Sequence, residues 1–375
     1  MMKRRRIRNG LMVALVAMGM MVGTAVAQDL YWSGAGTWGV DSKWATSSGG
    51  TYDQPWTAGA IAHFEGSAGT VDVSGNIDLS GLRFDVNNYT VAGGTLDFRG
   101  GSSIDRTTVN TRGYITSAIT GSPTVNQMFN GGKTYWTIAG GTLGMYQGLE
   151  FLPTSGTVAL GTVNNPQSPA SGDKSGLFLG GTTTGNTVDQ ILRPGGNYGS
   201  VGKDGTGEWT VDGDIATGFL AIKEGKLAIN GTVTATYIQF SLGANGILAP
   251  GAGIGTVAFN AYWRFIESGA TIEWECLNNE TAGTTYDQVV LNTGAYWDMA
   301  AMTGTDKFNI NVVGLDGWKV GVGDTFQLMA GDVRNFDASK FNIIGDGTWT
   351  ISNSGGLLLT STFGTAPSGI LLIIH

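Results

Sequence analysis

The sequence predicts an all-β protein, most of it a right-handed parallel β-helix, a solenoid of stacked coils. Three observations favour this fold. Apolar side chains alternate with polar ones in short runs and rarely recur at helical spacing. Glycine makes up 62 of 375 residues, more than twice the usual ~7%, and similar segments recur along the chain. A β-sandwich or jelly roll uses the same ingredients and is the alternative fold.

The chain opens with a basic segment and an apolar run. Five basic residues stand within the first eight positions, and an apolar stretch from Leu11 to Val22 follows them. This order is typical of a secretory signal peptide, and Ala25-Val26-Ala27 supplies the small residues of a cleavage site. We therefore predict a signal peptide over residues 1–27. The apolar stretch is shorter than the ~20 residues of a membrane-spanning helix, so we expect no transmembrane segment in the mature chain.

The predicted mature chain is acidic. Five of the 21 basic residues belong to the signal and all 29 acidic residues follow it, which leaves 16 basic residues and a net charge of −13. Such a charge opposes nucleic acid as a partner. Cys276 is the only cysteine, so no disulfide can form within the chain. The 41% of hydrophobic residues suffice for a large core, and the glycines therefore separate ordered strands.

Residues 28–68 are predicted to form an aromatic-rich N-terminal cap. Trp32, Trp38, Trp44 and Trp56 fall within this short span. The first coil of a solenoid has an exposed strand edge that invites aggregation, so it needs a cap.

Residues 69–260 are predicted to form the β-solenoid repeats. YTVAGGTLDF at 89–98 matches WTIAGGTLGM at 136–145, and EWTVDGDI contains the related Trp209. Tyr89 and Trp136 are 47 positions apart and Trp209 lies 73 further on. Both gaps divide into coils of roughly 23 to 24 residues, within the range expected of solenoids.

Residues 261–375 are predicted to form a C-terminal all-β region, either a β cap or a small sandwich-like domain. Glycine becomes less frequent there, and strands lengthen, as in TIEWECL and YDQVVLN. Alternation along this region places Phe308, Ile310 and Val312 in the core, as it does Phe326 and Leu328.

Several segments resemble a known family. YWSGAGTWGVDSKW, AHFEGSAGTVDVSGNIDLSGLRF, YTVAGGTLDF and LAPGAGIGTVAF are similar to segments of the autotransporter-associated β-strand repeat proteins of bacteria with outer membranes, as are YDQVVLNTGA and VGDTFQLM. The resemblance implies a parallel β-helix exported to the cell surface or beyond, without catalytic activity of its own. The sequence departs from the autotransporter pattern after Thr360, where the remaining residues are too few for a membrane barrel.

Histidine and cysteine are too scarce for most catalytic and metal sites. A Ser-His-Asp triad would need His63 or His375. His63 stands between Ala62 and Phe64 in an apparent strand, so we predict a structural role for it. Structural zinc needs four Cys or His ligands, and the sequence has three such residues.

Gly34, Gly36 and Gly39 match the spacing of a dinucleotide-binding loop, but no helix and no βαβ pattern follows them. We predict a glycine-rich turn there, and another bend at GAGIG, residues 251–255.

Carboxylates leave one catalytic possibility open. Glu273 and Glu275 share one side of a strand at ~7 Å spacing, which a glycosidase could use; we instead expect Ile272, Trp274 and Cys276 to face the core and both glutamates to face water. A β-helix lyase would need basic groups beside acids, for which Lys203-Asp204 and Lys223-Glu224-Gly225-Lys226 are local candidates that look like turns.

Calcium is a weaker possibility at Asp204-Gly205-Thr206-Gly207 and Asp346-Gly347. We assign no catalytic, cofactor-binding or metal-binding residue.

The sequence thus favours an exported, non-catalytic structural or adhesive protein of the cell surface or extracellular space, with glycans or other surface proteins as partners. A polysaccharide lyase or glycoside hydrolase on the same scaffold is the alternative.

Overall fold

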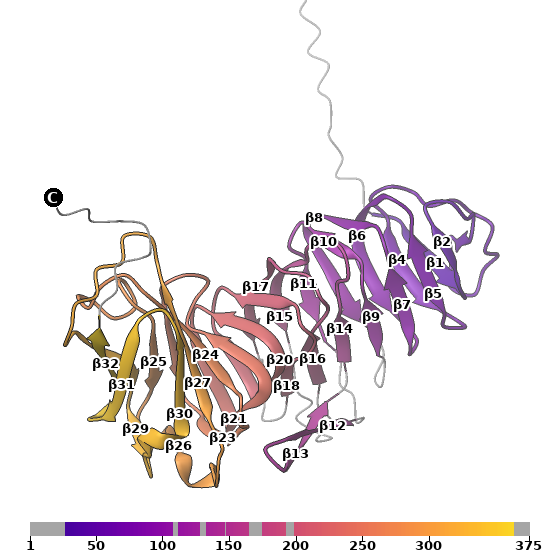
Figure 1. Cartoon of the computed structure of the whole chain (residues 1–375). Coiled ribbons are helices and arrows are strands. Elements are labelled where there is room, and N and C mark those ends of the chain that lie inside the picture. Colours follow the sequence, from indigo (N-terminus) through magenta and orange to yellow (C-terminus); the bar gives the residue numbers. More distant parts are fainter. Residues whose placement is uncertain are drawn as a thin grey trace, which may run out of the picture.

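The computed structural model describes residues 27–107, 112–127, 133–146, 148–164, 175–192 and 199–363. The chain is all-β, with one long and mostly parallel sheet and one separate hairpin. Figure 1 shows the strands stacked side by side from the indigo N-terminal coils to the yellow C-terminal ones. Residues 1–26 of the predicted signal and the tail after Phe363 lie outside the described residues. Within the described ranges, no helix has the length and apolar character needed to cross a membrane.

Strand pairing divides the stack into three sets of parallel strands, here called faces one, two and three. The first coil supplies strands to faces one and two, and each later coil supplies all three. Face one contains β1 (Asp29–Ser33), β4 (Ile61–Glu65), the second halves of β6 (Asn76–Phe84) and β8 (Thr95–Arg106), β11 (Thr124–Asn126), the second halves of β15 (Ala159–Asn164) and β17 (Asn186–Leu192), the starts of β20 (Ile215–Ile229) and β21 (Thr232–Ala249), β22 (Thr256–Phe259), β25 (Gln288–Leu291) and β28 (Thr325–Ala330). Face two contains β2 (Gly36–Trp38), β5 (Thr70–Val73), β7 (Tyr89–Ala92), β9 (Gly113–Ile115), β14 (Gly148–Phe151), β16 (Ser175–Leu179), β18 (Gly199–Lys203), the middles of β20 and β21, β23 (Tyr262–Ile266), β26 (Tyr296–Asp298) and β29 (Asp332–Arg334).

Face three completes each coil after the first. It contains the first halves of β6, β8, β15 and β17, β10 (Ala118–Thr120), β19 (Glu208–Val211), the ends of β20 and β21, β24 (Thr271–Cys276), β27 (Phe308–Gly314) and β30 (Phe341–Gly345). This coil-to-coil parallel pairing is consistent with a β-helix. It is not the antiparallel pairing of a sandwich or jelly roll.

Parallel pairing continues across residue 260. β22, β23 and β24 each pair in parallel with β21, and the same three-face order continues to β30. Antiparallel pairing in the described residues of this part consists of an isolated bridge between Cys276 and Tyr286 and of the end of the stack, where β32 (Gly356–Phe363) lies between β28 and β31 (Thr348–Asn353). Two 3₁₀ turns are present in this part: η1 (Met299–Ala301) follows β26, and η2 (Ala338–Lys340) precedes β30. The domain boundaries themselves stay predictions.

One apolar core runs through the stack, because alternate side chains of each strand point inward. Val71 and Val73 are buried while Asp72 between them is exposed, as the alternation predicts. The predictions for the C-terminal region are also confirmed, since the following side chains are all buried: Phe308, Ile310, Val312, Phe326 and Leu328.

The four N-terminal tryptophans pack together at the first coils. Trp38 and Trp44 have ring centroids 5.1 Å apart, and Trp56 lies 4.8 Å from Trp38. β3 (Trp44–Ala45) pairs in antiparallel fashion with β1. The first strand therefore has a neighbour on the side that faces away from β4.

The regular repeat predicted from the matching segments is wrong. Residues 89–98 form β7 and the start of β8, whereas residues 136–145 belong to an antiparallel hairpin of β12 (Lys133–Ile138) and β13 (Gly141–Tyr146). Figure 1 shows this hairpin set apart from the main stack. Coil length varies because insertions between strands differ: Val201 pairs with Leu220, 19 residues on, but Ile115 pairs with Phe151, 36 residues on.

Candidate functional site

The β12–β13 hairpin packs on the outer side of face two. The outward positions of β16, β18 and β20 there are Phe178, Gly202 and Ala221, which are paired in successive strands. Trp136 of the hairpin meets Phe178 edge to face, with ring centroids 5.5 Å apart. A Cβ at Gly202 would lie 2.7 Å from Cη2 of Trp136. Glycine in the middle of this strand therefore makes room for the tryptophan.

A small apolar cluster holds the hairpin in place outside the main core. Its buried members are Trp136, Ile138, Leu143, Met145, Phe178 and Ala221. The alternation of apolar residues in this segment predicted a coil of the solenoid. It instead buries one side of the hairpin, which carries Trp136, Ile138, Leu143 and Met145.

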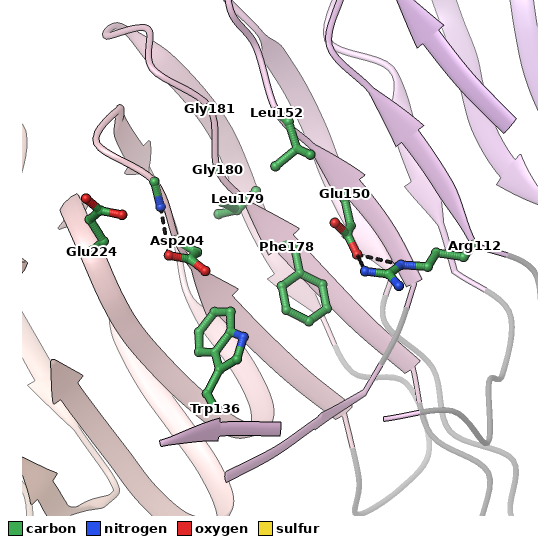
Figure 2. Close-up of a pocket in the computed structure, with 11 residues that line it drawn as sticks. Arg112, Trp136, Glu150, Leu152, Phe178, Leu179, Gly180, Gly181, Asp204 and Glu224 are labelled. Carbon is green, nitrogen blue, oxygen red and sulfur yellow. Dashed lines mark hydrogen bonds and ion pairs between the residues drawn. The ribbon is translucent and has the colours of Figure 1, made fainter. Parts of the chain in front are cut away.

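A pocket of about 400 Å³ lies at the margin of the hairpin. Its lining combines aromatic and aliphatic side chains, glycine backbone and four charged side chains: Trp136, Leu152, Phe178, Leu179, Gly180, Gly181, Gly205, Arg112, Glu150, Asp204 and Glu224. Figure 2 shows Glu224 and Asp204 on one side of the pocket, Glu150 with Arg112 on the other, and the rings of Trp136 and Phe178 between them. We call this the hairpin pocket.

On one side of the hairpin pocket, Arg112 and Glu150 form an ion pair. Nε of Arg112 donates to Oε1 of Glu150 at 2.7 Å, and Nη2 donates to the same oxygen. The guanidinium also lies 4.9 Å from the ring centroid of Tyr114. Burial raises the pKa of Glu150 above its ordinary value, and the hydrogen bonds from Arg112 offset part of that rise.

On the other side, Asp204 accepts hydrogen bonds from Nζ of Lys223 at 3.1 Å and from the backbone N–H of Gly205 at 3.0 Å. The Lys223 ammonium also lies 5.4 Å from the ring centroid of Trp136. It thereby links the turn after β18 to the hairpin. The carboxylate of Glu224 makes no hydrogen bond to any described residue. This carboxylate is therefore available to a ligand.

The lysines considered for a lyase lie in different surroundings. Lys203 is fully buried and points inward, where Nζ donates to the carbonyl oxygens of Gly205 at 2.6 Å and Glu224 at 2.9 Å. Burial lowers the pKa of Lys203 to about 8. It is a structural group beneath the pocket. Residues 223–226 lie inside β20, where a register shift and the left-handed Gly225 bend the strand.

Glu273 and Glu275 face outward, and Ile272, Trp274 and Cys276 are fully buried, as predicted. Nζ of Lys226 donates to Oε1 of Glu273 at 2.6 Å. Burial raises the pKa of Glu275, and the charge of Glu273 adds to the rise.

These glutamates border a cavity of about 220 Å³. Glu273, which is paired with a lysine, thus stands beside Glu275, whose pKa is raised, and two carboxyl groups in such different surroundings are a pairing that acid–base chemistry can use. The neighbouring Asp287 is fully occupied in structure, because it accepts backbone N–H groups of Gly255 and Glu275 at 2.8 and 2.7 Å.

His63 lies in β4 between two carboxylates. Its Nδ1 is 3.0 Å from Asp85 and its Nε2 is 3.0 Å from Asp29, and Tyr31 stacks on the ring at 4.5 Å. Burial lowers the pKa of His63, but the hydrogen bonds to Asp85 and Asp29 outweigh it, so the pKa is raised overall. Both ring nitrogens are engaged, which supports the predicted structural role.

The other candidates occupy turns. Gly34 and Gly39 have φ of 85° and 94° on either side of β2, and residues 251–255 bend between β21 and β22. Oδ2 of Asp346 accepts the N–H of Gly314 at 2.9 Å. Among the described residues, no group of three or more His, Cys, Asp or Glu side chains is placed to hold a metal ion. Calcium binding stays a prediction.

Sequence reasoning missed Trp136, Phe178, Arg112 and Glu150 as a group. They come from four different strands or turns, and only pairing of the coils brings them together. One local signal was present: Phe178 occupies an outward position of an otherwise apolar run, SGLFLGG, where a solvent-facing strand would carry a polar residue.

Comparison with known proteins gives one distant relationship. No protein-family model matches the sequence, so membership of the β-strand repeat family stays a prediction. Over 225 residues, 53% of this chain, the sequence is 27% identical to the adhesin BmaC autotransporter of Brucella suis biovar 1 (strain 1330). The match spans only 6% of the length of that adhesin. The chain is therefore distantly similar to a small part of an autotransporter adhesin.

Proposed function

We propose that the chain is an exported, non-catalytic adhesive protein of the bacterial cell surface and that its hairpin pocket binds a glycan. The similarity to an adhesin supports a surface adhesive role. The proposed fold is a right-handed parallel β-helix, because strand–crossover–parallel-strand connections are right-handed in about 98% of cases. The acidic, glycine-rich sequence and the N-terminal signal pattern support export.

The observation that carries the proposal is the composition of the hairpin pocket. Sugars present hydroxyl groups around a ring with apolar C–H faces. Trp136 and Phe178 supply apolar surface, while Arg112, Asp204 and Glu224 supply polar atoms at its rim. Such a combination of apolar lining with few polar groups is typical of small-ligand sites.

The pairing of the charges favours binding over turnover. Arg112 is already bound to Glu150, and Lys223 to Asp204. A lyase base or a glycosidase acid must exchange protons with the substrate, whereas these groups are engaged with each other. An ion pair of this kind still offers its remaining lone pairs and N–H groups to sugar hydroxyls.

A glycan array and calorimetry with the retained glycan test the proposal. Glu224→Gln removes the one carboxylate of the hairpin pocket that has no hydrogen-bond partner among the described residues, and we expect about tenfold weaker binding, since one charged hydrogen bond contributes roughly 1.5 kcal/mol. Glu280→Gln, an equal change of charge at an exposed residue outside the pocket, is the matched control and should bind normally. Retention of no glycan by the array would refute the glycan-binding role.

The enzyme alternative has its own test. The same glycans are incubated with the protein, and reducing ends and unsaturated products are measured. We expect no turnover. Turnover that disappears in Glu273→Gln would replace the adhesive proposal with a glycoside hydrolase centred on Glu273 and Glu275.

A further inference from the structure

Two outward tyrosines stack on face two, several coils beyond the hairpin pocket. Tyr262 of β23 and Tyr296 of β26 have ring centroids 4.3 Å apart. On the other side of Tyr296, the guanidinium of Arg334 from β29 lies 3.8 Å from the ring centroid. Arg334 is fixed in turn by Asp332, to which its Nε donates at 2.7 Å. Neighbours on both adjacent coils therefore hold the Tyr296 ring in place.

The same tyrosines border a cavity of about 460 Å³. Its other walls come from Trp263, Arg264 and Asp298 and from Ala300 and Ala301 of η1. Both tyrosines are only partly buried. We call this the tyrosine pocket.

Three polar groups of the tyrosine pocket, the hydroxyls of Tyr262 and Tyr296 and the guanidinium of Arg264, make no hydrogen bond to any described residue. Arg264 is exposed and lies over the ring of Phe265, 5.0 Å from its centroid, and it pairs with no carboxylate in the described ranges. Asp298 is held by the amide of Asn335 and the N–H of Ala300, and these hydrogen bonds lower its pKa, so it is ionised at neutral pH.

These groups fit a saccharide. The tyrosine ring edges and η1 offer apolar contact for C–H groups, and the free phenols and guanidinium offer hydrogen bonds to hydroxyls. A ladder of tyrosines that only stabilised neighbouring coils would need the rings and not the hydroxyls. This difference separates a binding site from a structural stack.

Both pockets lie on the same face of the molecule. Five successive parallel pairings lead from β16, which carries Phe178 of the hairpin pocket, to β26, which carries Tyr296. At ~4.8 Å for each pairing, the two strands are roughly 24 Å apart. Phe265, beside Arg264, packs against the hairpin cluster, so the cluster reaches β23, the strand that carries Arg264 of the tyrosine pocket.

We infer that the tyrosine pocket is a second saccharide site and that the two sites together select a polymeric glycan over short fragments. This inference rests on the proposed function. A chain long enough to occupy both sites gains affinity because the second contact is intramolecular, an effect that reaches 10²–10⁴ in favourable geometries. A fragment that fills only one pocket gains nothing.

Calorimetry with two series of oligosaccharides tests the inference: neutral gluco-oligosaccharides from the disaccharide upward, and acidic oligogalacturonates of the same lengths. We expect affinity in at least one series to rise by a hundredfold or more once the oligomer spans roughly 24 Å. The double variant Tyr262→Phe/Tyr296→Phe keeps the stacked rings and removes only the hydroxyls. It should lose the gain of long oligomers and leave the affinity of short ones unchanged.

Tyr31→Phe is the matched control, because it removes a hydroxyl from an outward tyrosine at the far end of the stack. Equal affinity for short and long oligomers in both series, or full retention of the gain in the double phenylalanine variant, would overturn the inference while leaving the glycan-binding role intact. Failure of both series and of every array glycan to bind would refute the glycan-binding role and the second site together, whereas failure of both series alone would overturn the second site.

Discussion

Residues 89–98 and 136–145 have nearly the same sequence and opposite structures. In the first segment, β7 and β8 pair with strands of neighbouring coils and bury Tyr89, Val91 and Leu96 in the main core. In the second, β12 and β13 pair with each other and bury Trp136 and Met145 against the outside of face two. The same alternation of apolar and polar side chains therefore packs into the main core in the first segment and against the outside of face two in the second.

The two segments also differ in the position of the turn between their strands. In the coil, φ is positive at Gly93 and Gly94, whereas in the hairpin it is positive at Ala139 and Gly140. When the segments are aligned, the hairpin turn falls one residue earlier. Two consecutive residues with positive φ between paired neighbours are what a tight β-hairpin requires. Local sequence thus permits both outcomes, and the surface available for packing decides between them.

The largest contrast is expected when the leading aromatic residue of each segment is removed. Tyr89 is fully buried, and its hydroxyl contacts Glu65 O at 2.8 Å and Ser67 O at 2.7 Å. Tyr89→Ala should lower the free energy of unfolding by about 3–5 kcal/mol. Trp136→Ala should lower it by clearly less than Tyr89→Ala, because its ring is buried only in the small hairpin cluster, while exposing the hairpin. Urea denaturation and amide hydrogen exchange measure the two effects.

Tyr89→Phe serves as the control for the core position, since it keeps the ring and should cost only about 1–2 kcal/mol. Equal losses of global stability in Tyr89→Ala and Trp136→Ala would mean that the hairpin belongs to the main cooperative unit, contrary to this comparison.

A smaller contrast is expected at the turns. A Cβ at Gly94 would lie 2.5 Å from the carbonyl oxygen of Gly75 and 2.7 Å from that of Val73, whereas a Cβ at Gly140 meets nothing within 4 Å. Gly94→Ala should therefore destabilise the coil by more than about 2 kcal/mol, and Gly140→Ala should cost the hairpin about 1 kcal/mol, the strain of a left-handed alanine. Urea midpoints and hydrogen exchange of each segment provide the comparison. A tolerated Gly94→Ala would contradict the backbone contact.

The contact between hairpin and stack can be broken on its own. Gly202→Val places side-chain atoms where Trp136, Met145 and Phe178 meet, and we expect docking to weaken by about 1–3 kcal/mol. Faster hydrogen exchange over residues 133–146 and weaker glycan binding would report this. Gly100→Val is the matched control, because a Cβ there meets nothing within 4 Å. Unchanged exchange in Gly202→Val would show that the hairpin does not rest on this glycine.

The smallest expected effect is a pH dependence of stability that the N-terminal coils should show and the hairpin should not. The pKa of His63 is raised above 6.5 in the folded protein, so its contribution to stability is fully present below pH 6.5 and is lost as pH rises through the raised value. Between about pH 6 and pH 7, the N-terminal coils should therefore lose stability while hairpin docking stays constant, because His63 is the only histidine in the described ranges and the pKa of Lys203, beneath the hairpin pocket, is lowered only to about 8. Hydrogen exchange of residues 61–65 and 133–146 at several pH values measures this, and His63→Gln should abolish the dependence.

The sequence was most informative where side chains alternate between core and solvent. It predicted the all-β class and the orientation of Phe308, of Phe326 and of the strand from Ile272 to Cys276, because a period of two residues fixes which side chains share a surface. It could not predict coil length, since insertions between strands change the spacing without disturbing the pairing. For the same reason it missed the hairpin pocket, whose residues meet only after the coils from β9 to β20 are stacked.

The pairing of Ile115 with Phe151 has a practical consequence. An insertion that contains a whole hairpin separates these partners, yet the coils before and after it keep their register. A scaffold with such a junction can acquire or exchange a surface hairpin in a single event of recombination. In the laboratory, the same junction is a suitable place to graft foreign peptides for display.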